Sequence, residues 1–150
     1  MSHSYVSSFF HCVWSTHERR KTVSHDLRER FFPYMGGIAR ENDMKTLAIG
    51  GMDDHVHVLL SVPAVLSVAK AIQLIKGGSS KWIHDTFPSR RDFAWQEGYG
   101  AFSISVTHVR QAIQYINRQE EHHRKKTFEE EFLGLLKKHG IKYDERYVWG

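Results

Sequence analysis

Two histidines one residue apart, His55 and His57, lie in the stretch DDHVHVLLSVP, which otherwise has the composition of a buried strand. Alternate side chains of a strand point to the same face, so both imidazoles are expected on one side and Val56 and Val58 on the other. Two converging neutral imidazoles supply half of a divalent metal site, and the other ligands must come from elsewhere. The motif alone leaves open a pair of hydrogen-bonded structural histidines.

A second group of candidate residues lies in the segment 107–126, where apolar residues recur at helical spacing. Tyr115 and Gln119 lie one turn apart on an arc of their own, away from the apolar arc. A tyrosine hydroxyl can attack phosphorus and form a phosphotyrosine when a cation polarises the phosphate, and a carboxamide oxygen can bind the same ion. We therefore predict Tyr115 as the nucleophile, with His55, His57 and Gln119 as metal ligands. The alternative is a half-exposed tyrosine over the helix shoulder.

The elements that must position these residues follow from apolar periodicity and turn signals. Four strands are predicted, at residues 5–16, 45–50, 55–62 and 101–106, with helices at residues 23–42 and 67–87 between them. This βαββαβ order is the split βαβ, or ferredoxin-like, α+β fold, in which a four-stranded antiparallel sheet carries both helices on one face. The opposite face, with the two histidines, is then left open for another part of the chain.

Local features carry further expectations. The second helix is expected to be interrupted at its glycine pair, residues 77–78, because glycine has poor helix propensity. A third helix is expected over residues 107–126 with Thr107 as its cap, followed by a short amphipathic helix capped by Thr127. The acidic run at residues 129–131 is predicted to be the solvent-exposed first turn of that last helix, where negative charge suits the helix dipole.

The composition of the 150 residues, 41% hydrophobic and 25% charged, predicts one globular domain over residues 1–150. The sequence lacks an apolar run of the roughly 20 residues that span a bilayer, and its start does not have the pattern of a secretory signal. Cys12 is the single cysteine and cannot form an intramolecular disulfide, which fits a reducing compartment. We therefore expect a cytoplasmic protein without a membrane partner.

The charge of the chain favours a polyanionic partner. Its formal net charge is +4 with a pI near 9.2, and basic residues cluster in ERRK, SRR and HHRKK. Solvated surface is the alternative explanation for such short runs. The role of the histidine pair at residues 122–123 is also undecided, since these side chains could contact phosphate, carry protons or lie on a solvated helix surface.

In combination, three stretches resemble one known family: HVH after a short turn, WQEGYGAFSIS before a helix, and YINRQEEHH in that helix. They are similar to the single-tyrosine HUH transposases of the insertion-sequence two-hundred-like group, including their REP-associated relatives. The resemblance extends over nearly the whole chain, from SFFHCVWSTHERRK to FLGLLKKHGIKYDERYVWG. Val56 stands at the hydrophobic position of the HUH motif, and Tyr115 and Gln119 match its tyrosine and metal-binding glutamine.

The resemblance implies a ferredoxin-like enzyme that uses Mg²⁺ or Mn²⁺ on single-stranded DNA bearing a hairpin. Attack by Tyr115 would give a 5′-phosphotyrosine and a free 3′-hydroxyl, followed by strand transfer. Members are dimers whose catalytic helix can serve the partner's histidines, so composite active sites are expected. The residues expected to contact DNA are five basic residues and one histidine, namely Arg19, Arg20, Lys21, His122, Arg124 and Lys125.

Two other functions remain open at this point. The chain could be a domesticated relative that binds hairpins without cutting them, or a phosphodiesterase that uses metal-bound water. The presence of His55, His57, Tyr115 and Gln119 together favours the transposase over the binding module.

Overall fold

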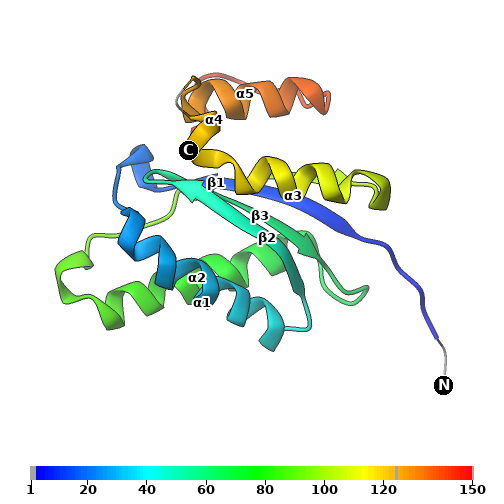
Figure 1. Ribbon diagram of the computed structural model, residues 1–150, viewed down its shortest axis with the longest axis horizontal. Helices are drawn as coiled ribbons and strands as arrows, with labels where there is room; N and C mark the ends of the chain where they lie inside the picture. The colour runs from blue at the N-terminus through cyan, green and yellow to red at the C-terminus, as the bar shows by residue number, and fades with distance from the viewer. Residues whose placement is uncertain (1–2, 124, 150) are drawn as a thin grey trace.

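The computed structural model describes residues 3–123 and 125–149 and has the predicted βαββαβ core (Figure 1). The sheet is antiparallel, in the order β2-β3-β1-β4. Its strands are β1 (Phe9–Ser15), β2 (Lys45–Met52), β3 (His55–Ser61) and β4 (Gly100–Ile104). The ferredoxin-like α+β fold predicted from the sequence is therefore confirmed, with β3, the histidine strand, in the interior of the sheet.

Helices α1 (His25–Glu41) and α2 (Val68–Thr86) cover one face of the sheet (Figure 1). Ser24 and Ser67 cap the two helices, because their side-chain hydroxyls accept hydrogen bonds from the backbone N–H groups of Leu27 and Lys70. The main core lies between these helices and the valine side of β3. Among the described residues there is no helix both long and apolar enough to cross a membrane.

The expected interruption of α2 at its glycine pair is wrong, since the helix is continuous through residues 77 and 78. The reason is packing against α1. A Cβ at Gly78 would lie 2.9 Å from Ile38 Cδ1, so the missing side chain lets the two helices approach closely. This tertiary contact outweighs the poor helix propensity of glycine, which costs about 1 kcal/mol per residue.

The opposite face of the sheet is covered by α3 (Val109–Asn117), α4 (Gln119–His122) and α5 (Phe128–Lys138) (Figure 1). The single helix predicted over residues 107–126 is wrong. It begins after a 3-10 turn that includes Thr107, so His108 takes the cap position, and it breaks at Arg118, whose φ of −105° and ψ of 24° are not helical. Hydrogen bonds of the buried Gln119 amide with neighbouring side chains stabilise the chain beyond this break. Two further 3-10 turns connect the elements, at His17–Arg19 and Pro88–Arg90.

Helix α5 forms a second, smaller core on this face. Thr127 caps it as predicted, and Phe128, Phe132 and Leu136 pack with Val13 of β1 and other apolar residues of the face. The predicted exposure of residues 129–131 is wrong at Glu131, which is only 4% exposed. The helix turns this carboxylate toward the sheet, together with its apolar residues.

Candidate active site

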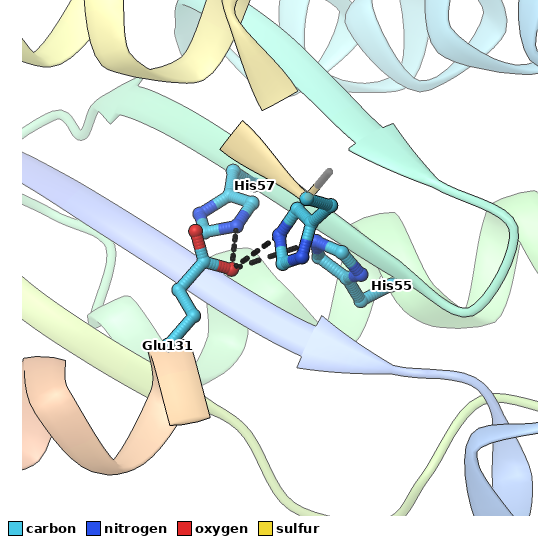
Figure 2. A group of neighbouring side chains, drawn as sticks. His55, His57 and Glu131 are labelled. Atoms are coloured by element: carbon cyan, nitrogen blue, oxygen red, sulfur yellow. Dashed lines mark hydrogen bonds and ion pairs between the residues drawn. The ribbon is translucent and has the colours of Figure 1, made fainter. Parts of the chain in front are cut away.

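The two histidines of β3 point toward α3 and α5, on the side of the sheet opposite to α1 and α2 (Figure 2). Alternation along the strand explains this, because Val56 and Val58 belong to the main core while Leu59 packs under α3. The imidazole rings of His55 and His57 lie 5.2 Å apart, centroid to centroid. The shared face predicted from the sequence is thus present, but both side chains are buried rather than open to solvent.

Tyr115 and Gln119 reach the same place from the end of α3 and the start of α4. The carboxamide oxygen of Gln119 lies 3.0 Å from His55 Nε2. The ring of Tyr115 lies 5.7 Å from the ring of His57, and Tyr115 is half-buried. One chain therefore brings together the four residues that the sequence singled out as nucleophile and metal ligands.

Glu131 of α5 occupies the centre of this group, and its carboxylate points from α5 toward the histidines of β3 (Figure 2). Its Oε1 atom lies 2.9 Å from His57 Nε2. Its Oε2 atom accepts hydrogen bonds from the Tyr115 hydroxyl and, at 3.2 Å, from the Gln119 amide. Sequence reasoning missed Glu131, although a signal existed: it stands three residues after Phe128 and one before Phe132, within the apolar stripe of the helix.

His123 is a second residue that sequence reasoning did not assign to the site. Its Nε2 atom lies 3.0 Å from both Glu131 Oε1 and Gln119 Oε1. One ligand atom each from His55, His57, His123 and Glu131 lies within 4.8 Å of the others. Imidazole nitrogens and a carboxylate are the donors that proteins use for divalent transition metals, so this donor set fits the ion implied by the HUH motif.

A second layer of polar side chains orients the two strand histidines. Asp54 Oδ1 lies 2.7 Å from His55 Nδ1, and His11 Nε2 lies 2.7 Å from His57 Nδ1. Such partners fix the ring orientation and the tautomer of a ligating histidine. Burial lowers the pKa of His11 to about 3 and that of His57 to about 4, so both imidazoles are neutral near pH 7.

The charge of Glu131 dominates the electrostatics of the site. Burial opposes its ionisation, but hydrogen bonds from His123 and His57 outweigh burial and hold the pKa of the Glu131 carboxyl well below its usual range. Burial, together with this neighbouring negative charge, raises the pKa of the Tyr115 hydroxyl well above its usual value. The phenol is therefore kept protonated and hydrogen-bonded to a carboxylate.

A cavity of about 520 Å³ adjoins the site at His123 and is lined by charged residues of both signs: Lys21, Lys125, Lys126, Asp53, Asp54, Glu129 and Glu130. The two predicted DNA contacts Lys21 and Lys125 therefore line one cavity, although they lie far apart in the chain. His122 lies beside the nucleophile, with its Nε2 atom 3.4 Å from the Tyr115 hydroxyl.

The remaining candidate DNA contacts have different surroundings. The Arg19 side chain pairs with Glu129 of α5 at 3.4 Å and lies over the ring of Trp149. Arg20 pairs with Glu18 at 2.9 Å on an exposed surface. Arg124 lies outside the described residues.

Comparison with known proteins gives concordant matches. The family model described as "Transposase IS200 like" matches residues 4–119. The ISDra2 transposase TnpA of Deinococcus radiodurans is 21% identical over 117 residues, which is 75% of this chain and 84% of that protein.

Solved structures with the same fold include two transposase-related chains. A crystal structure of a candidate transposase from Deinococcus radiodurans R1 has a TM-score of 0.65 at 23% identity, over 79% of this chain and 96% of the other. A REP-associated tyrosine transposase bound to a REP hairpin has a TM-score of 0.57 at 14% identity, over 79% of this chain and 70% of the other.

Proposed function

The chain belongs to the IS200-like transposase family, and we propose that it cleaves and rejoins single-stranded DNA through a covalent link to Tyr115. The observation that carries this proposal is the position of the Tyr115 ring beside His57, with Gln119 in contact with His55, inside one chain. A nucleophile beside a set of metal-binding side chains is the arrangement that phosphodiester transfer requires.

The proposed step exchanges one phosphodiester bond for another. The Tyr115 oxygen attacks phosphorus, its bond to phosphorus forms, and the bond from phosphorus to the 3′ oxygen of the preceding nucleotide breaks. The phenol proton leaves through Glu131 Oε2, to which the hydroxyl is hydrogen-bonded, and is released to water, while water supplies the proton that the departing 3′ oxygen takes up. A divalent ion, Mg²⁺ or Mn²⁺, held by His55, His57 and Gln119 would supply positive charge at the phosphate oxygens.

The products are a 5′-phosphotyrosine and a free 3′-hydroxyl. Because the new bond is also a phosphodiester, attack by a 3′-hydroxyl reverses the reaction and joins two DNA ends without an external energy source. The phosphate thus leaves the enzyme through strand transfer rather than through hydrolysis.

The proposed substrate is a single strand with a hairpin. A structural relative is bound to a REP hairpin, and Lys21 and Lys125, which can contact phosphates, lie in the cavity next to the site. We also propose contacts from Arg19, Arg20, His122 and Arg124. A homodimer remains a prediction from the family, and the meeting of Tyr115 with the histidines of its own chain favours a site that acts within one subunit.

Incubation with a 5′-labelled and a 3′-labelled hairpin-bearing single strand in Mn²⁺ tests the proposal. We expect a protein-DNA adduct that survives denaturation and carries the label of the 3′ fragment, whose 5′-phosphate is linked to tyrosine. Tyr115→Phe should abolish the adduct. Tyr34→Phe, which removes a hydroxyl from a ring stacked on Trp82 of α2, should leave it unchanged.

Two results would contradict the proposal. Tight hairpin binding without any adduct or cleavage would indicate a binding module. Cleavage that persists in Tyr115→Phe would indicate a phosphodiesterase that uses water as its nucleophile.

A further inference from the structure

We propose that His123 and Glu131 are ligands of the same ion as His55, His57 and Gln119, and that the completed site prefers a transition metal to Mg²⁺. The inference rests on the proposed function in one respect, because it assumes that the ion takes part in the reaction of Tyr115. It adds two ligands that come from the chain after residue 119, where the match to the family model ends.

The first argument is the direction of the imidazole lone pairs. His55 Nδ1 faces the carboxylate of Asp54 at 2.7 Å, and His123 Nδ1 faces the carbonyl oxygen of Lys126 at 2.8 Å. Both partners accept hydrogen bonds, so each Nδ1 atom carries a proton and Nε2 is the ring nitrogen that can bind an ion. These two Nε2 atoms are the ones directed at Gln119 and Glu131.

The second argument is the convergence of ligand-type atoms at the centre of the site. His123 Nε2 lies 3.0 Å from both Glu131 Oε1 and Gln119 Oε1, and His57 Nε2 lies 2.9 Å from the same carboxylate oxygen. Two imidazole nitrogens, a carboxylate oxygen and a carboxamide oxygen thus meet in the buried centre, and such a set of donor atoms is suited to a bound cation.

The third argument is the spacing of the donor atoms. Glu131 Oε1 lies 2.9, 3.0 and 3.6 Å from the Nε2 atoms of His57, His123 and His55. Ligands at about 2.1 Å from one ion lie about 3.0 Å apart in an octahedron and about 3.4 Å apart in a tetrahedron. These three separations are close to those of neighbouring ligands around a single ion.

The fourth argument is that the fold holds Glu131 in this position. Phe128 and Phe132 anchor α5 on either side of Glu131 by packing onto the sheet, and the ring of Phe128 stacks 4.5 Å from that of His55. A carboxylate so deeply buried is costly unless it is paired with positive charge. A divalent ion supplies that charge.

The composition of the site determines which ion it prefers. Three imidazoles with one carboxylate and one carboxamide suit Mn²⁺, Co²⁺ or Zn²⁺, whereas Mg²⁺ favours oxygen ligands and retains most of its waters. The proposed site therefore discriminates against Mg²⁺ through its three nitrogen ligands.

Calorimetric titration of the full chain with Mn²⁺ and with Mg²⁺, without DNA, tests the inference. We expect Mn²⁺ to bind at least about tenfold more tightly than Mg²⁺. Glu131→Gln, which keeps the shape and removes the charge, should weaken Mn²⁺ binding at least about tenfold. Glu130→Gln makes the same change at the neighbouring exposed position and should have no effect.

A second readout uses Co²⁺, whose visible absorption reports its ligands. His123→Asn and Glu131→Gln should each change the Co²⁺ spectrum, and circular dichroism before titration verifies that each variant is folded. If Glu131→Gln does not fold, His123→Asn alone decides. If a folded variant keeps the metal affinity and the Co²⁺ spectrum of the parent chain, the substituted residue is not a ligand. If the parent chain does not bind Mn²⁺, a proton on His123, rather than an ion, satisfies Glu131 Oε1 and Gln119 Oε1.

The metal-binding experiments and the adduct assay can fail independently of each other. Adduct formation with unchanged metal binding in both variants would overturn this inference and leave the function of Tyr115 intact. Loss of metal affinity in Glu131→Gln, in a protein that never forms an adduct, would support the metal site and overturn the proposed function.

Discussion

The backbone of Gly50 in β2 lies directly against the carbonyl group of Ile116 in α3, with no room for a side chain between them. Any Cβ at position 50 would overlap with that carbonyl oxygen. Ile116 is fully buried and adjoins Tyr115 in the last turn of α3. The glycine therefore sets how closely the helix of the nucleophile approaches the histidine sheet.

Gly50→Ala should displace the end of α3 and weaken the site. We expect a loss of about 1–3 kcal/mol in the free energy of unfolding, as for other overpacked cores, and a clear decrease in adduct yield. Gly77→Ala is the matched control, because among the described residues nothing lies within 4 Å of a Cβ there, and it should stabilise α2 by about 0.5–1 kcal/mol. Urea denaturation and the adduct assay measure both quantities, and a Gly50→Ala protein that equals the parent in both would contradict this role for the glycine.

Asp54 should tune the metal affinity through His55. Its carboxylate accepts from His55 Nδ1, and loss of such a partner commonly lowers metal affinity about 10–100-fold. We therefore expect Asp54→Asn to weaken Mn²⁺ binding by that factor in calorimetry. Asp53→Asn provides the control, because Asp53 pairs with Arg28 at 2.7 Å instead of with a histidine, so it should change stability without changing metal affinity.

A mixture of two inactive variants tests whether the site acts within one subunit. Tyr115 lies beside His57 of its own chain, with their rings 5.7 Å apart. If this geometry is the reactive one, Tyr115→Phe mixed with His57→Ala should form no adduct, because neither chain has a complete site. Recovery of adduct in the mixture, above the level of each variant alone, would show instead that α3 serves the histidines of a partner subunit.

The sequence could predict those parts of the site that depend on neighbouring residues, but not those that depend on contacts between distant elements. Strand alternation is local, so the common face of His55 and His57 followed from two-residue periodicity and is confirmed. The break at Arg118 depends on hydrogen bonds between Gln119 and residues from other elements, and no local pattern encodes them.

Glu131 lies between the local case of the two histidines and the long-range case of the break at Arg118. Its spacing from Phe128 and Phe132 places it within the apolar stripe of α5. Its acidic neighbours and its place in the first turn suggested a favourable dipole interaction at the surface instead. The burial of the helix face on the sheet, a tertiary contact, decides between the two.

Metal binding and the docking of α5 should stabilise each other, because Glu131 connects them. Mn²⁺ at 100 times its dissociation constant should add about 2.7 kcal/mol to the free energy of unfolding, and a chelator should remove this gain. Hydrogen exchange at the backbone amides of α5 should slow when Mn²⁺ is added, more than exchange in α1, which packs on the far face of the sheet. Glu131→Gln should lose this protection of α5. Equal slowing of α5 in that variant would show that the ion acts on the helix through other residues.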